Sequence, residues 1–324
     1  MTIDGSSNSA GPWPYRLSVA TAVVAVLLVA MGGTVTTLRA GMAESNWINP
    51  DGYFLWTYPL DRYLGDKNVF VEHTHRLLGS IVGLLAIATA IATWFKEKRP
   101  IARTIAWLAV LAVCVQGLLG GLRVLENSPE LAFVHGALAQ AVFALLTATC
   151  LVLSPRWVAA APSACKSAGG LQRASSVGAA LVFAQVTVGA WLRHSGSDLA
   201  LAVHTLLALF VLAAVVISGR RLRTTAQHAR DGGRDLSALL GIKRRLHMLI
   251  GVQVVLGACA TFWIYEVSGG MQAPVSVGEA VFATAHVLVG ALLLAQMVAA
   301  AMWSRRVVCS PARAESLAVP QGAR

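Results

Sequence analysis

Long, nearly uncharged apolar segments are the feature of this sequence that most limits its fold. The first is Leu17–Leu38, and similar segments recur along the whole chain. A helix of about 20 apolar residues crosses the hydrocarbon core of a bilayer, and within lipid its backbone polar groups must be satisfied internally. Only 13% of the residues are charged, against about 25% in a soluble domain. The sequence therefore predicts an all-α, polytopic membrane protein.

The apolar segments predict eight transmembrane helices, arranged as two pseudo-repeated four-helix bundles. We expect the helices at residues 17–38, 71–95, 103–123, 131–153, 174–192, 199–218, 246–265 and 279–303. The predicted division of the chain is a cytoplasmic N-terminus at 1–16, an N-terminal half at 17–155, a cytoplasmic linker at 156–173, a C-terminal half at 174–303 and a cytoplasmic tail at 304–324.

The formal net charge of +11 is spread in a way that indicates membrane topology and not nucleic-acid binding. Lys and Arg gather in the second, fourth and sixth connections and in the tail, whereas the other connections carry as many acidic residues as basic ones or more. Basic residues of membrane proteins concentrate on the cytoplasmic side. We therefore expect both termini in the cytoplasm, and the even-numbered helices to run from outside to inside.

A short motif, a glutamine followed four residues later by a glycine, occurs three times. Its copies are Gln116–Gly120, Gln185–Gly189 and Gln253–Gly257. The first predicted helix keeps a glycine pair at residues 32–33 but has no matching glutamine. After each glutamine copy, a histidine lies near the start of the following helix. The repeat indicates two similar halves, although transporters also use internal repeats.

Four of the eight histidines lie at equivalent depth, near the outer ends of the even-numbered helices. They are His75, His135, His204 and His286, and a Gly or Ala follows each of them four residues later. One histidine in an apolar helix is often a packed, hydrogen-bonded residue, but four at one depth favour metal ligation. Two histidines per half suit an iron porphyrin held from both faces better than a zinc or copper ion. The other four histidines are expected to have no ligand role.

Glu72 opens the second predicted helix and lies one turn from His75 on the same face. A carboxylate there could accept a proton or stabilise positive charge on a ring held by His75. The alternative is a structural glutamate at a helix N-terminus, stabilised by the helix dipole. Arg76 is a candidate contact for a haem propionate, or a partner for an acidic side chain.

The motif Glu72-x-x-His75-Arg76 resembles the signature of the haem A synthase family. The resemblance extends over residues 20–303 through the eight helices, the repeat, the four histidines and the segment Gly32-Gly33-Thr34-Val35-Thr36. Some bacterial members carry a cysteine pair in the first outer loop, which is absent from residues 40–71 of this chain.

This resemblance implies an oxidoreductase of the bacterial cytoplasmic (inner) membrane that oxidises a ring methyl group of haem O to a formyl group. His75 and His135 would hold the substrate haem O, and His204 and His286 would ligate the iron of a haem b cofactor. Glu72 would be the catalytic residue. The product, haem A, would serve terminal oxidases, a haem O synthase would supply the substrate, and the electron acceptor stays unassigned.

Two other functions fit parts of this pattern. A di-haem cytochrome b that carries electrons would also use four histidines, although such carriers usually place their haems on both sides of the membrane. A transporter would use ionisable residues nearer the membrane midplane. A Soret band would argue against the transporter, and conversion of haem O would argue against the electron carrier.

Overall fold

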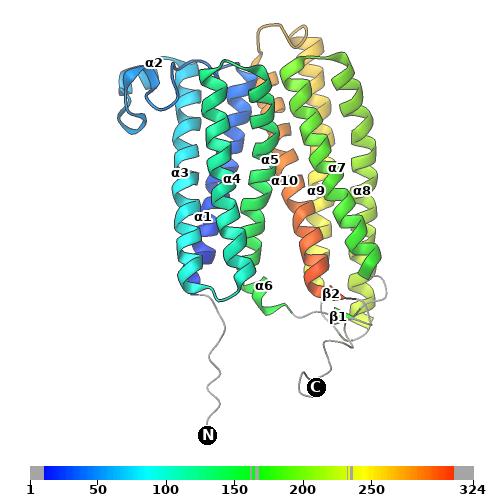
Figure 1. Cartoon of the computed structure of the whole chain (residues 1–324). Coiled ribbons are helices and arrows are strands. Elements are labelled where there is room, and N and C mark those ends of the chain that lie inside the picture. The colour runs from blue at the N-terminus through cyan, green and yellow to red at the C-terminus, as the bar shows by residue number, and fades with distance from the viewer. Residues whose placement is uncertain (1–10, 161–162, 165–167, 232, 234–235, 310–324) are drawn as a thin grey trace. The chain divides into compact units, whose positions relative to one another are not determined.

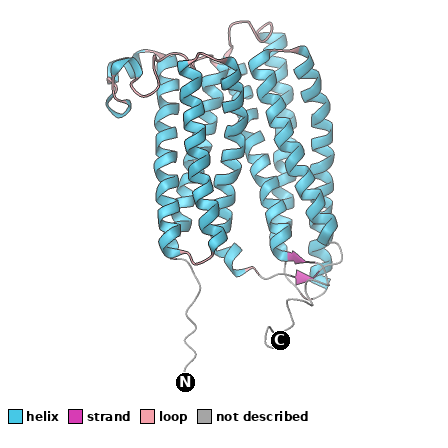
Figure 2. Cartoon of the chain, viewed as in Figure 1, coloured by secondary structure: helices cyan, strands magenta, loops and turns pink. Residues whose placement is uncertain are grey.

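Eight long helices dominate the structure, a computed structural model that describes residues 11–160, 163–164, 168–231, 233 and 236–309. Each is long and apolar enough to cross a membrane. They are α1 (Pro12–Thr37), α3 (Lys67–Lys96), α4 (Pro100–Leu125), α5 (Pro129–Leu153), α7 (Ala168–Ser195), α8 (Asp198–Asp231), α9 (Ser237–Phe262) and α10 (Val277–Val307). The prediction of an all-α, multi-pass membrane protein is confirmed (Figures 1 and 2). Most of the predicted N-terminus and tail, and part of the predicted linker, lie outside the described residues.

The remaining elements are short. Between α1 and α3 lie two 3₁₀ turns and a small helix, and a π-helical turn continues α9. The elements between α1 and α3 are η1 (Pro50–Gly52), η2 (Leu55–Thr57) and α2 (Leu60–Gly65), and the π-helical turn is η3 (Trp263–Val267). A further short helix is α6 (Pro155–Ala159), and two short parallel strands pair as β1 (Ser163–Ala164) and β2 (Val308–Cys309).

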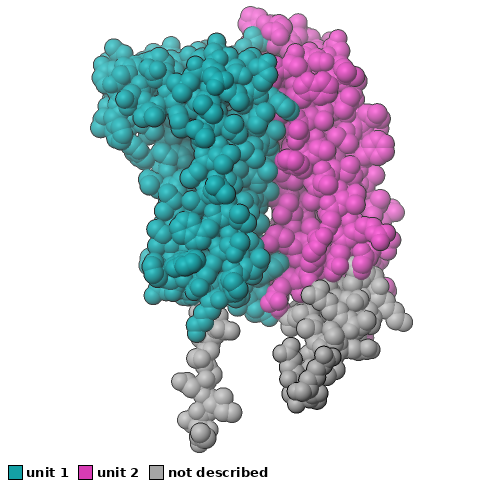
Figure 3. Space-filling view, in the orientation of Figure 1, with its two compact units in different colours: residues 1–35, 39–159 teal, residues 36–38, 160–324 magenta. Residues whose placement is uncertain are grey.

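The helices fall into two compact units (Figure 3). Unit 1 comprises the residues up to Val35 together with Arg39–Ala159, and unit 2 comprises Thr36–Leu38 and the residues from Ala160 onward. In unit 1, α4 packs against both α3 and α5. In unit 2, α7 and α9 each pack against both α8 and α10. Each unit thus contains four of the spanning helices.

Large apolar side chains cover the outward faces of these helices. Leu84 on α3 is 61% exposed and Leu209 on α8 is 63% exposed. Contiguous apolar surface of this kind is rare on soluble monomers. Lipid tails could cover this surface and leave no backbone polar group unpaired, because the hydrogen bonds of the helices are made internally.

Several helices are longer than the apolar segments predicted. The prediction ended one helix at residue 218, but α8 continues to Asp231, and α9 begins at Ser237 instead of residue 246. In the extension of α8, Arg220 and Arg221 are exposed while Leu222 is buried. Charged residues end a membrane-spanning segment, but an amphipathic helix can continue beyond it. Hydropathy therefore marked the limits of the apolar segments and not those of the helices.

The start of α3 is defined by a side-chain cap. The carboxylate of Asp66 accepts hydrogen bonds from the backbone N–H groups of Asn68 at 2.7 Å and Val69 at 3.1 Å. Such a cap satisfies donors that the first helical turn leaves unpaired. It also sets the position at which α3 begins, and therefore the faces on which Glu72 and His75 lie.

Candidate functional site

Each unit brings two of the predicted histidines together. In unit 1, His75 from α3 and His135 from α5 have ring centroids 6.5 Å apart, with ring planes inclined at 76°. In unit 2, His204 from α8 and His286 from α10 have centroids 6.1 Å apart, with planes inclined at 67°. All four residues lie toward the N-terminal ends of their helices.

A glycine on the preceding long helix lies against each of these histidines. An added Cβ would approach the histidine Cε1 atom to 2.9 Å in three cases and 3.0 Å in one, closer than carbon atoms normally pack. The four contacts are Gly32 with His75, Gly120 with His135, Gly189 with His204 and Gly257 with His286. Any larger residue would push the ring aside, so these glycines set the position of the histidine rings.

The repeated glutamines contact three of the same histidines. Gln116 donates through Nε2 to the backbone carbonyl of His135 at 2.9 Å, and Gln185 does the same to His204 at 3.0 Å. The Nδ1 atom of His135 lies 3.2 Å from the carbonyl oxygen of Gln116, and that of His286 lies 3.2 Å from the carbonyl oxygen of Gln253. A histidine that donates from Nδ1 keeps Nε2 unprotonated and able to bind a metal.

The spacing of the histidines suits two ligands on opposite sides of one metal. Metal–imidazole bonds are about 2 Å long, which places the centroids of two opposed rings about 6 Å apart. The described part of the chain holds no group of three or more His, Cys, Asp or Glu residues suited to a metal ion. A metal held by one pair would need its other ligands from elsewhere, and a porphyrin supplies four nitrogens. The residues present therefore fit a haem between each pair.

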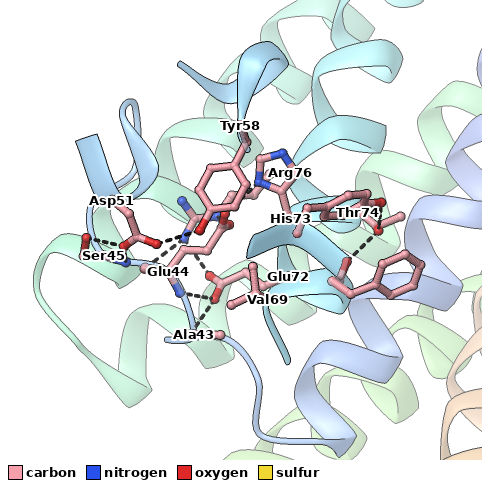
Figure 4. Close-up of polar contacts among 12 residues, drawn as sticks. Ala43, Glu44, Ser45, Asp51, Tyr58, Val69, Glu72, His73, Thr74 and Arg76 are labelled. Atoms are coloured by element: carbon pink, nitrogen blue, oxygen red, sulfur yellow. Dashed lines mark hydrogen bonds and ion pairs between the residues drawn. The ribbon is translucent and has the colours of Figure 1, made fainter. Parts of the chain in front are cut away.

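Glu72 is buried at the start of α3, with an exposed fraction of 1%. Its Oε2 atom accepts hydrogen bonds from the backbone N–H groups of Ala43 at 2.7 Å and Glu44 at 3.1 Å (Figure 4). Its Oε1 atom accepts from Arg76 at 2.7 Å. These contacts hold the Glu72 carboxylate in one orientation. They also attach the loop between α1 and α3 to the helix that carries His75.

Glu44 is a second buried acid in this cluster, and no motif in the sequence indicates it. Its side chain is fully buried, with Oε1 at 2.7 Å from His73 Nδ1 and Oε2 at 3.2 Å from Arg76 Nε. Burial raises the pKa of Glu44 above its usual value, although Arg76 and His73 oppose this effect. Glu44 lies 29 residues from His73 in the sequence. No helical spacing could have indicated this contact.

Two tyrosines of the loop enclose His73. The ring of Tyr58 lies 4.6 Å from the His73 ring, and that of Tyr63 lies 5.2 Å away. Tyr58 donates its hydroxyl hydrogen to Asp51 at 2.7 Å. This hydrogen bond is the main cause that lowers the pKa of Asp51. The pKa of Tyr58 is raised to about 12, first by burial of its hydroxyl group and second by the interaction with Asp51. His73 is thus held by side chains of the loop.

Together, the fold and the site define a class: multi-pass helical membrane proteins with a bis-histidine pair in each of two units. A profile of the cytochrome oxidase assembly protein family matches residues 15–201. The chain belongs to that family. The matched region contains Glu72, His75 and His135, whereas His204 and His286 follow it in the sequence.

Individual relatives are similar over shorter segments. A protein of Chelativorans sp. named Heme A synthase is 36% identical over 133 residues, which are 39% of this chain and 37% of the relative. A Heme A synthase of Shouchella clausii is 29% identical over 191 residues, 57% of this chain and 60% of the relative. The Protoheme IX farnesyltransferase 1 of Natronomonas pharaonis is 33% identical over 127 residues, 39% of this chain and 25% of the relative. The chain thus spans less than two thirds of the length of each relative.

Proposed function

We propose that this protein is a haem A synthase, which oxidises a ring methyl group of haem O to the formyl group of haem A. The observation that carries the proposal is the pairing of His75 with His135, together with Glu72 near the N-terminal end of the helix that carries His75. The family and the names of two relatives support it. The conversion would proceed through two hydroxylations of the methyl carbon, each passing two electrons to an acceptor of unassigned identity, and the resulting diol would lose water to leave the formyl group.

The two histidine pairs would have different roles. His75 and His135 would bind the substrate haem O in the N-terminal half, proposed at 17–155. His204 and His286 would bind haem b in the C-terminal half, proposed at 174–303. A bound haem b would supply one-electron redox chemistry there. The glycine and glutamine contacts support both assignments, since they orient the rings before any ligand enters.

Glu72 would be the catalytic residue. The two backbone N–H groups and Arg76 hold its carboxylate in one place. A negative charge held beside the ring could stabilise positive charge that develops on the reacting substituent, without reorganisation at the moment of reaction. Arg76 was predicted either to contact a propionate or to pair with an acidic side chain. Its ion pairs with Glu72 and Glu44 support the second role, in which it positions Glu72.

The protein would lie in the bacterial cytoplasmic membrane with both termini inside, as the distribution of Lys and Arg indicates. A haem O synthase would supply the substrate. The similarity to a protoheme farnesyltransferase supports a place beside a haem prenylation step. The electron acceptor stays unassigned.

Expression of the chain together with a haem O synthase in a host that lacks haem A tests the proposed function. Extracted membrane haems should then include haem A, and expression without the synthase should produce none. A purified protein with a low-spin haem spectrum that leaves haem O unchanged would instead identify an electron-carrying cytochrome b.

A further inference from the structure

A ring held by His75 and His135 would carry ionised carboxylates, and Arg76 is poorly placed to bind them. Its Nη1 atom donates to the backbone carbonyl of Asn46 at 2.7 Å, and Nη2 donates to Glu72 at 2.7 Å. Its Nε atom lies 3.2 Å from a carboxylate oxygen of Glu44. Every nitrogen of the guanidinium is therefore already engaged. A ligand carboxylate would have to break one of these buried contacts.

Arg123, near the C-terminal end of α4, has far fewer contacts. Among the described residues, Arg123 donates one long hydrogen bond, from Nη2 to the backbone carbonyl of Gly41 at 3.4 Å. No ion pair to Arg123 forms within the part of the chain that the structure describes. A guanidinium has five N–H donors in a planar fork that matches a carboxylate. Most of this donor capacity is not used by the protein.

The surroundings keep Arg123 beside the histidine pair. Gly120, one turn earlier on the same face of α4, is the glycine that lies against His135. The guanidinium is also within electrostatic range of His75 and Glu72. The oxygens of Glu72 already accept three hydrogen bonds, so Glu72 does not form an ion pair with Arg123.

The loop between α1 and α3 closes over this side chain. A Cβ at Gly41 would lie 2.8 Å from both Nη1 and Nη2 of Arg123, so the loop backbone rests directly on the guanidinium. Arg123 is only half-exposed as a result. A partly desolvated cation is stabilised most effectively by an anion in direct contact.

We propose that Arg123 binds a carboxylate substituent of the porphyrin that His75 and His135 hold. The ligand class is a metalloporphyrin with ionised carboxylates, and the contact is a charge-assisted hydrogen bond from the guanidinium. This proposal rests on the proposed function. It is confined to unit 1, because the comparable Arg193 of unit 2 donates to Thr37 Oγ1 at 2.6 Å.

The test compares iron protoporphyrin IX with its dimethyl ester, in which both carboxylates are blocked. Each is titrated into the purified full-length chain and followed through the Soret band. A His286→Ala background leaves unit 1 as the remaining bis-histidine pair. Arg123→Gln should weaken binding of the free acid by about tenfold or more, as expected for loss of a hydrogen bond to a charged group. It should leave binding of the ester unchanged.

Two further variants make the result specific. Arg123→Lys keeps the charge and should retain a preference for the free acid. Arg62→Gln removes an exposed cation from the same loop and should change neither affinity. Equal weakening of acid and ester by Arg123→Gln, or no weakening of either, would overturn the proposal. Undiminished binding in His75→Ala would instead count against the proposed function, because the ring would then not depend on this pair.

Discussion

Glu44 Oε1 lies 2.7 Å from Nδ1 of His73, and both side chains are buried. This contact joins the loop between α1 and α3 to the first turns of α3, directly beside Glu72. The backbone N–H of Glu44 is one of the two that bind Glu72, so the same loop residue also positions the proposed catalytic carboxylate. The loop is therefore part of the site in unit 1.

Loss of the Glu44 contact should loosen the loop. Glu44→Gln removes the charge that faces His73 and Arg76, and we expect it to lower the free energy of unfolding by about 1–3 kcal/mol. Thermal unfolding in detergent measures the loss, and limited proteolysis should show faster cleavage between residues 45 and 60. Asp61→Asn, an exposed acid in the same loop, serves as the control. Equal stability of the two variants would show that the Glu44 contact contributes little.

Glu72→Gln should separate catalysis from binding. The amide keeps the size of the side chain but removes the negative charge, and only interactions stronger in the transition state accelerate a reaction. We expect near-normal haem occupancy and loss of most haem A formation, whereas His75→Ala should also disturb haem binding in unit 1. Pigment analysis of membranes, with bound haem quantified on the same samples, gives both values. Near-wild-type haem A would leave Glu72 as a structural residue.

The glycine contacts predict a difference between two substitutions on α9. A methyl group in Gly257→Ala would lie 2.9 Å from His286 Cε1, so we expect reduced haem b occupancy and an altered low-spin spectrum. In the matched control Gly251→Ala, the new methyl group would meet no atom within 4 Å. Absorption spectra of the two purified variants provide the comparison. Identical spectra and haem content would show that the ring position tolerates the added group.

The Tyr58–Asp51 pair predicts an alkaline transition of the loop. The pKa of Tyr58 is raised to about 12 from 10.0 by burial and by Asp51. A raised pKa means that the folded state favours the protonated tyrosine. Its contribution to stability is complete below pH 10 and is lost as the pH rises through about 12. Ultraviolet titration, with Tyr58→Phe to identify the signal, should show Tyr58 ionising at lower pH in Asp51→Asn.

Reporter fusions test the predicted orientation. Fusions after residues 98, 165, 235 and 310 should report the cytoplasm, because the basic residues gather in those connections. Fusions after residues 60, 128 and 270 should report the outside. The opposite pattern would place the four histidines toward the inner face of the membrane.

The membrane-spanning segments and the four histidines could be recognised without a structure, because both depend on local features of the chain. Hydropathy over about 20 residues reports burial in lipid wherever a helix lies. The recurring glutamine precedes His135 and His204 by 19 residues and His286 by 33. The predicted end of α8 and the predicted start of α9 were wrong, because a helix can continue through polar residues after it leaves the membrane.

The long-range contacts depended on the tertiary structure. Glu44 meets His73 and Gly41 lies on Arg123 only because the first loop returns over the ends of α3 and α4. Such contacts follow from the path of an irregular loop, for which the sequence has no periodic signal. Local sequence thus determined the helices and the positions of the four histidines. The packing of the loop decided which charges surround Glu72, because electrostatic partners are selected by distance in space and not by separation along the chain.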